Sequence, residues 1–192
     1  MKSLLLFSIA CLGLAGCSYV SENVQVSYQP MIQSNSKVPI ADTNVTVMVV
    51  DNRRDGKQVG RKKGDYGIEL ASIKLKGDLA NEVAAAVQTE LQNLGCNIKE
   101  GNLGVEIEIQ KFYNEFKPGF MGGRGIAELI LGVSVKKSDG HIVYSKTIIG
   151  LGENDSVWAH SGKNAKVALD GAFNDAVHKL ISDQAFLQTL RK

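Results

Sequence analysis

Cysteine is scarce in this sequence, and its scarcity limits the kinds of site that the chain can build. The 192 residues include three cysteines, and two of them, Cys11 and Cys17, lie in or just after a short apolar segment at the start. Cys96 is therefore alone in the rest of the chain. A lone thiol can form neither an internal disulfide nor a thiolate metal cluster. Because Cys96 follows an expected helix end, we expect a small buried side chain there rather than a reactive thiol.

The chain also lacks an excess of charge of either sign. Its 22 basic and 20 acidic residues give a formal net charge of +2. Removal of residues 1–16 would take away one basic residue, Lys2, and no acidic one. A nearly neutral domain has no overall attraction to nucleic acid or anionic lipid. We therefore expect no nucleic-acid partner.

No apolar run in the sequence is long enough to cross a bilayer, which takes about 20 residues. The apolar run over residues 4–14 is short, follows Lys2 and ends at the small residues Ala15 and Gly16. This order of a positive start, an apolar centre and small residues is typical of a cleaved secretory signal. The sequence thus predicts a signal peptide over residues 1–16.

The four residues Leu14-Ala15-Gly16-Cys17 resemble the lipobox of bacterial lipoproteins. The resemblance implies cleavage between Gly16 and Cys17, a diacylglycerol on the Cys17 sulfur and a third acyl chain on the new amino group. Three acyl chains would anchor the protein permanently, since one chain alone binds a membrane only marginally. Ser18 stands where an aspartate would resemble an inner-membrane retention signal, so we expect the outer membrane, on its periplasmic face. A plain secretory signal cut after Ala15 is the alternative.

Residues 17–43 differ in composition from the rest of the chain. They are polar and contain two of the three prolines. They predict a lipidated N-terminus and a tether that holds the domain on the order of 30 Å from the membrane. Apolar and polar residues alternate within this segment, which favours an edge strand over residues 23–29. Residues 44–192 are long enough for one sizeable core, and we expect a single globular domain there.

Apolar periodicity after the tether predicts an α+β fold. Alternation indicates strands over 44–51 and 105–109, and a hairpin over 127–149 that turns at Asp139-Gly140. Recurrence at three or four residues indicates helices over 78–95, from about 164, and over 184–190. The strand at 44–51 is apolar on both faces, so we expect it to be covered on both sides. The expected architecture is a mostly antiparallel or mixed sheet with two long helices packed on one face, a two-layer sandwich.

Several of these segments together resemble the YajG family of bacterial lipoproteins. They are the lipobox, the strand NVTVMVVDNRRD, the helix DLANEVAAAVQTELQNLG, the hairpin AELILGVSVKKSDGHIVYSKT and the closing SDQAFLQTL. The glycine-rich stretch GFMGGRG at residues 119–125 departs from the family pattern. The resemblance implies an envelope lipoprotein of uncharacterised role and supplies no catalytic residues.

No motif of a catalytic or metal site stands at its required spacing in the sequence. Ser34 and Lys37 match S-x-x-K, but the S-D-N and K-T-G motifs that accompany it in penicillin-binding enzymes are absent. Glu106 and Glu108 share one face of a strand, whereas glycosidase carboxylates flank their substrate from two sides. The three histidines show no zinc-binding spacing. We expect a protein that is not an enzyme and that has no cofactor and no metal.

A basic segment at residues 51–65, DNRRDGKQVGRKKGD, is the first candidate contact surface. Six bases lie in it against three acids, and each base near an anionic surface contributes about 1 kcal/mol. The six are Arg53, Arg54, Lys57, Arg61, Lys62 and Lys63. A solvated connection between two strands is the alternative for the segment. A structural ion-pair turn is the alternative for its Asp51-x-Arg53-x-Asp55 motif.

Two aromatic stretches are further candidates for partner contact. Phe120 and Met121 lie in a glycine-rich loop with little core to receive them, which suits docking to protein or membrane. A loop that folds back on its own sheet is the alternative. Trp158 is the only tryptophan, and aromatic anchors dominate interfaces. Its alternative role is to pin a loop onto the core.

These features favour a non-enzymatic interaction or accessory component of an envelope assembly, such as one for secretion, flagella or transport. Its expected partners are the membrane, through the lipid anchor, and other envelope proteins that pair with a sheet edge or contact the basic and aromatic segments. The alternative is a module that binds lipid or cell-wall glycan in a cavity between helices and sheet.

Overall fold

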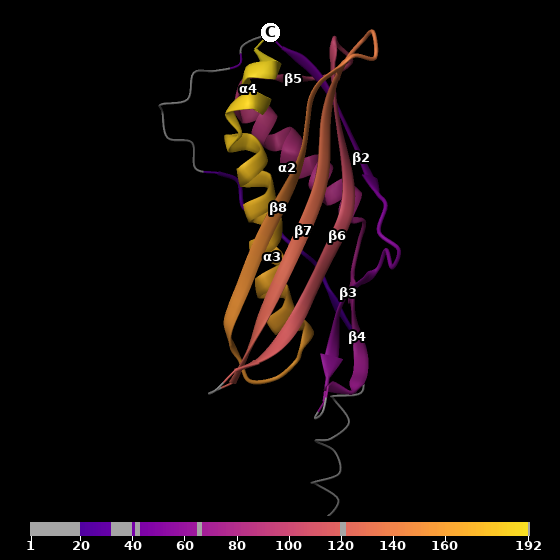
Figure 1. Ribbon diagram of the computed structural model, residues 1–192, viewed down its shortest axis with the longest axis vertical. Coiled ribbons are helices and arrows are strands. Elements are labelled where there is room, and N and C mark those ends of the chain that lie inside the picture. The colour runs from indigo at the N-terminus through magenta and orange to yellow at the C-terminus, as the bar shows by residue number, and fades with distance from the viewer. Residues whose placement is uncertain (1–19, 32–39, 41–42, 65–66, 120–121, 192) are drawn as a thin grey trace, which may run out of the picture.

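The protein is an α+β structure in which a mixed eight-stranded sheet carries helices on one side (Figure 1). The computed structural model describes residues 20–31, 40, 43–64, 67–119 and 122–191. The fold class predicted from the periodicity is confirmed. Two helices, α2 and α3, pack against the sheet, and the third, α4, closes one end.

The described strands differ greatly in length. The short ones lie at the edges, and the three longest form the hairpins in the second half of the chain. In chain order they are β1 (Glu22–Val24), β2 (Asn44–Asp51), β3 (Gln58–Lys63), β4 (Glu69–Leu75), β5 (Asn97–Ile98), β6 (Leu103–Gly119), β7 (Gly122–Lys137) and β8 (Ile142–Val157).

Strand β6 is the centre of the sheet because it pairs along both of its edges. On one edge it is antiparallel to β7, which pairs in turn with β8. On the other edge β2 runs parallel to the first half of β6, and β3 bridges the second half where Gly60 meets Asn114. Strands β4 and β1 extend the sheet beyond β3. Strands β2 and β3 therefore lie end to end along β6, close to the bulge between Ile109 and Lys111.

The helices begin and end close to the predicted positions. Helix α2 (Leu79–Asn93) starts after Asp78, whose carboxylate accepts hydrogen bonds from the N–H groups of Ala80 and Asn81. Gly95 follows its end with a φ of 90°, which suits a residue without a side chain. Helix α3 spans Gly162–Ser182, and α4 spans Gln184–Leu190.

The two faces of the sheet differ in what covers them. On β6, Val105, Ile107 and Ile109 are buried beneath the helices, and the intervening glutamates point away from them, as the alternation predicts. The expectation that β2 is covered on both faces is wrong. Met48 and Val50 are more than half exposed, because no described element packs on the face opposite the helices.

Helix α3 approaches β8 closely enough for backbone to touch backbone. A Cβ atom at Gly152 would lie 2.0 Å from the carbonyl oxygen of Ala168, and one at Gly150 would lie 2.2 Å from that of Ala172. Alanines and glycine on the facing side of α3 leave the space for this approach. The edge of β8 is also bonded to the helix, because Leu151 N–H donates to Asp175 at 2.8 Å.

The described part of the segment expected to be a tether is docked on the domain. Strand β1 pairs in parallel with β4, at the edge of the sheet. Val24 and Val26 are buried in the same core as the rest of the chain, and so is Ile40. Residues 20–31 and Ile40 therefore pack on the domain instead of forming a loose coil, because burial of these apolar side chains outweighs the entropy of a free chain.

Polar contacts hold the same segment against the helices. Tyr28 O–H donates to Glu90 of α2 at 2.6 Å, and the Met31 N–H donates to the same carboxylate at 2.8 Å. Burial, together with this carboxylate, raises the pKa of Tyr28. Ser27 donates to Asp170 of α3 from both its N–H and its hydroxyl. The carboxylate of Glu90 is thus paired within the core instead of being left unsatisfied.

The β7–β8 hairpin turns at Asp139-Gly140, as predicted, but it is wider than a two-residue turn. Gly140 has a φ of 84°, and its N–H donates to the Lys137 carbonyl at 2.8 Å. The Lys137 N–H donates to the His141 carbonyl, which closes a three-residue loop. Asp139 accepts from the His141 N–H.

Candidate interaction surfaces

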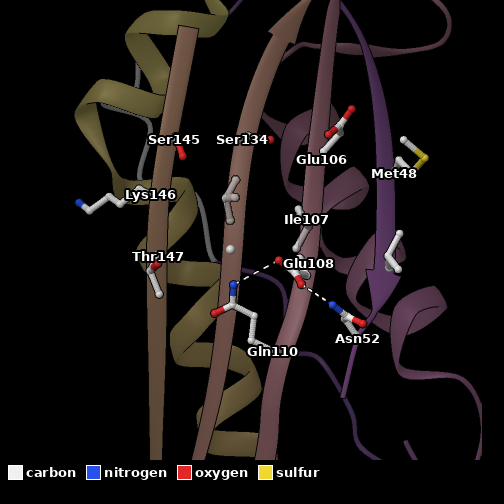
Figure 2. Close-up of a pocket in the computed structure, with 13 residues that line it drawn as sticks. Met48, Asn52, Glu106, Ile107, Glu108, Gln110, Ser134, Ser145, Lys146 and Thr147 are labelled. Atoms are coloured by element: carbon white, nitrogen blue, oxygen red, sulfur yellow. Dashed lines mark hydrogen bonds between the residues drawn. The ribbon is translucent and has the colours of Figure 1, made fainter. Parts of the chain in front are cut away.

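The sheet face turned away from the helices holds a groove of about 770 Å³ (Figure 2). It crosses β2, β6, β7 and β8, and we call it the open-face groove. Side chains from each strand line it, among them Met48, Val50, Asn52, Glu106, Glu108, Gln110, Ser134, Ser145 and Thr147. Apolar and polar groups therefore alternate across the same surface.

Exposed apolar side chains continue along this face beyond the groove. Met48 is 53% exposed and Val50 is 55% exposed. On β8, Ile149 and Leu151 follow Thr147 on the same face, and both are more than 40% exposed. Four large apolar side chains on one uncovered face are typical of a binding surface.

The groove also carries charged groups in defined positions. Hydrogen bonds from Asn52, at 2.6 Å, and from Gln110, at 3.2 Å, lower the pKa of Glu108 (Figure 2). The carboxylate of Glu108 therefore stays ionised at neutral pH. Glu106 pairs with Lys136 at 2.5 Å on the same face. The groove thus presents a fixed negative charge beside exposed apolar surface.

Arg53, predicted as a contact residue, is instead a structural residue. Its side chain is 5% exposed and pairs with Asp51 at 2.7 Å. Its guanidinium also donates to the backbone carbonyls of Phe112 and Gly56, across the gap between β2 and β3. Burial raises the pKa of Asp51, but hydrogen bonds from Arg53 outweigh it and lower the pKa overall. The ion-pair alternative therefore holds for Asp51 and Arg53, because the guanidinium satisfies both the Asp51 carboxylate and two backbone carbonyls.

The remaining bases of the segment do not form one exposed patch. Lys62 is buried on β3 and pairs with Glu22 of β1. Arg61 pairs with Glu69 at 2.7 Å, and Lys63 lies 3.6 Å from Glu115. The predicted basic loop is wrong here because residues 58–63 form strand β3, which points alternate side chains to opposite faces. Arg54 and Lys57 are exposed in the turn before it, and neither has a carboxylate partner among the described residues.

The aromatic candidates have different outcomes. Trp158 is 83% exposed, so it does not pin a loop onto the core. Phe120 and Met121 lie outside the described residues, and so do Gly16, Cys17 and Ser18.

The open-face groove was missed from the sequence although its residues were visible there. The alternation at 105–109 placed the two glutamates on a wet face, but it said nothing about the neighbouring strands. The sequence predicts that Met48 and Val50 are buried, because a strand that is apolar on both faces has the same sequence pattern whether its second face is covered or exposed. The available signal was that the sequence predicts two long helices, enough to cover one face of the sheet, and no further long helix for the other face.

Metal sites, reactive thiols and membrane-spanning helices each have structural requirements, which can be compared with the described part of the chain. No group of His, Cys, Asp and Glu there has the geometry to hold a metal ion. Cys96 is buried, and desolvation raises the pKa of its thiol, as expected for a structural cysteine. None of the described helices is long and apolar enough to cross a membrane.

Comparison with known proteins identifies a family and a shared fold. Residues 30–191 match the model of a family described as uncharacterized lipoprotein. No curated protein matches the sequence. A solved structure from Xanthomonas campestris has a TM-score of 0.66 at 11% identity, over 87% of this chain and 96% of that chain. A minor lipoprotein from Acinetobacter baumannii has a TM-score of 0.47 at 5% identity, over 76% and 94%. The Xanthomonas likeness shows a common fold.

Proposed function

The chain belongs to this family of uncharacterised lipoproteins, and from that premise we propose that it is a YajG-type lipoprotein of the outer membrane. In this proposal Cys17 carries the acyl chains and the domain lies on the periplasmic face. The protein catalyses no reaction and serves as an interaction or accessory component of an envelope assembly, such as one for secretion, flagella or transport. The lipobox at residues 14–17 supports the anchor, and Ser18 supports the outer membrane.

The open-face groove is the observation that carries the interaction role. Its exposed Met48 and Val50 lie beside the ionised Glu108, and Ile149 and Leu151 extend the apolar surface. The fixed charge on β6 thus lies between exposed apolar side chains on β2 and β8, and exposed apolar groups beside polar ones suit a surface that binds a protein segment. The complementary partner is a segment of another envelope protein that carries apolar and basic side chains.

A module for glycan or lipid has less support from the same surfaces. Among the described residues that line the open-face groove, none is aromatic, whereas sugar-binding sites use aromatic platforms for stacking. The space between sheet and helices is filled by fully buried side chains, including Phe173, Leu169 and Leu131. The core described here is therefore packed rather than hollow.

Photo-crosslinking in intact cells tests the proposed interaction. A photo-reactive phenylalanine analogue replaces Thr147 or Ser134 in the groove, and Gln92, exposed on α2, receives it as the control. We expect adducts to one envelope protein from the groove positions and none from Gln92. Charge reversal of Glu106 and Glu108 to Lys should abolish the adduct, whereas Glu100→Lys, the same change at an exposed site outside the groove, should preserve it.

Two results would contradict the proposal. Equal adducts from Gln92 and Thr147 would show that contact does not depend on the groove. Failure to capture protein, together with co-purification of lipid or glycan, would replace the interaction role with the binding module.

A further inference from the structure

The docked N-terminal segment brings the domain close to its point of attachment. Ser21 shares a hydrogen bond with Ser72 at 3.0 Å, so the ordered chain is fastened from its first described residues. Glu22 pairs with the buried Lys62 and accepts a hydrogen bond from the Gly162 N–H at 2.6 Å. Three residue steps separate Val20 from Cys17, and a fully extended chain spans about 11 Å over that distance. An acylated Cys17 therefore holds this end of the domain against the membrane.

This end of the domain lies opposite the C-terminus in Figure 1. The β1–β4 edge, the connection between β8 and α3, and the ends of β3 and β6 meet there. The parallel register of β1 with β4 leads from Val20 toward Ile68, which precedes β4. The ring of His160 lies 2.7 Å from the Lys63 carbonyl and stacks on Phe116. His160 thereby ties the connection between β8 and α3 to the end of β3 and to β6.

The most exposed large apolar side chains of the described residues all lie at this end. Trp158 is 83% exposed, Ile68 is 63% exposed and Val20 is 60% exposed. We call these three residues the anchored-end patch. Exposed tryptophan and aliphatic side chains are suited to the boundary between lipid headgroups and acyl chains, where tryptophan is enriched in membrane proteins.

Charge at the same end matches a phospholipid surface. Lys117, Arg124 and Lys163 are exposed, and none has a carboxylate partner among the described residues. Glu22, Glu69 and Glu115 are each paired with a base, which leaves Asp155 and Glu153, both on β8, as exposed acids without a basic partner shown among the described residues. Cations beside an anionic leaflet are attracted to it, whereas paired acids oppose the approach little.

We infer that the anchored-end patch rests in the interface of the membrane that holds the lipid anchor, so that the sheet stands on the bilayer by this end. The inference rests on the acylated Cys17 of the proposed function. It fixes the orientation of the domain, because contacts at Val20, Ile68 and Trp158 prevent free rotation on the anchor. The open-face groove, lined by β6 residues 106–110, then lies away from the bilayer, since β6 reaches the anchored end only at Gly119.

Trp158 is the only tryptophan, so its fluorescence reports directly on the inference. The acylated mature protein is reconstituted in vesicles of phosphatidylethanolamine and phosphatidylglycerol, with the non-acylated Cys17→Ser protein in buffer as reference. We expect emission at shorter wavelength in vesicles, and stronger quenching by nitroxide at the headgroup than by nitroxide at the end of an acyl chain. Ile68→Ser should reduce both effects, whereas Ile142→Ser, an equally exposed site in the β7–β8 turn region, should change neither.

Mass spectrometry of the N-terminal peptide shows whether Cys17 is acylated. It therefore distinguishes failure of the lipid anchor from failure of the membrane-contact inference. Acylated protein that binds vesicles while Trp158 emits as it does in water would overturn the membrane-contact inference and leave the anchor intact. Shielding of Trp158 only after another envelope protein was added would likewise overturn the membrane-contact inference. An unmodified Cys17, with protein that stays off the vesicles, would overturn both.

Discussion

The two faces of the sheet are made by the same strands but differ in how far their side chains are buried. Beneath the helices, Val45, Val105 and Ile107 are almost completely buried. On the opposite face of the same strands, Val50 and Met48 are more than half exposed beside Glu108, whose pKa is lowered by hydrogen bonds from Asn52 and Gln110. Strand chemistry alone therefore does not decide burial. The inner face is packed against helices, whereas the outer face carries exposed apolar and charged groups.

The inner face itself is packed in two ways. Against α2, β2 contributes branched aliphatic side chains such as Val45. Against α3, β8 contributes glycines, so that the helix backbone contacts the strand directly. A contact made by backbone tolerates no added atom, whereas an aliphatic contact can relax partly after a deletion.

Gly152→Ala should have the largest effect on stability. Its Cβ atom would lie 2.0 Å from the Ala168 carbonyl oxygen and 2.3 Å from the Ala172 nitrogen. Both are backbone atoms, so the helix must move, and we expect a loss of at least about 3 kcal/mol in the free energy of unfolding by urea denaturation. Gly56→Ala is the control, since nothing lies within 4 Å of its Cβ position. Equal stability of the two variants would mean that α3 does not lie this close to β8.

The same substitution on opposite faces of β2 should give the next largest effect. Val45→Ala removes a fully buried side chain, and we expect a loss of about 2 kcal/mol in the free energy of unfolding. Val50→Ala changes an exposed position and should cost less than about 0.5 kcal/mol. The comparison is made by urea unfolding of both variants. A large cost at Val50 would show that the outer face is covered within the protein itself.

Asp183→Asn should have the smallest effect, and one that depends on pH. A hydrogen bond from Lys146 of β8, then one from the Phe186 N–H, lowers the pKa of Asp183 below its ordinary value of 3.8. A lowered pKa adds stability above about pH 4 that is lost as the pH falls through the folded-state pKa. Asparagine still caps α4, so we expect a loss of about 1 kcal/mol or less at pH 7.

Urea unfolding across the acid range checks this dependence. The difference between the native protein and Asp183→Asn should narrow as the pH falls from about 5 toward 2, because protonation removes the pair with Lys146 in the native protein. Glu100→Gln, at an exposed site, is the control for a lost carboxylate. A difference that stayed constant with pH would show that the pair with Lys146 contributes nothing.

Much of the fold followed from local patterns. The cap at Asp78, the stop at Gly95 and the alternation at Val105, Ile107 and Ile109 each predicted an element that the structure contains. These signals succeed because capping, backbone conformation and strand alternation depend on residues adjacent in sequence. The prediction of an exposed basic loop failed for the opposite reason, since Lys62 is buried on β3 and pairs with Glu22 of β1, which is distant in sequence.

The sequence by itself determined the helices, strands β2 and β6, the β7–β8 hairpin, the α+β class and the buried position of Cys96. Only the tertiary structure decided which face of β2 is bare, where the described bases of residues 51–65 lie and that residues 20–31 pack on the domain. The docking of β1 places Val20 at the same end of the domain as Ile68 and Trp158. Local signals act between neighbours along the chain, whereas burial and pairing depend on elements that meet only after the chain has folded.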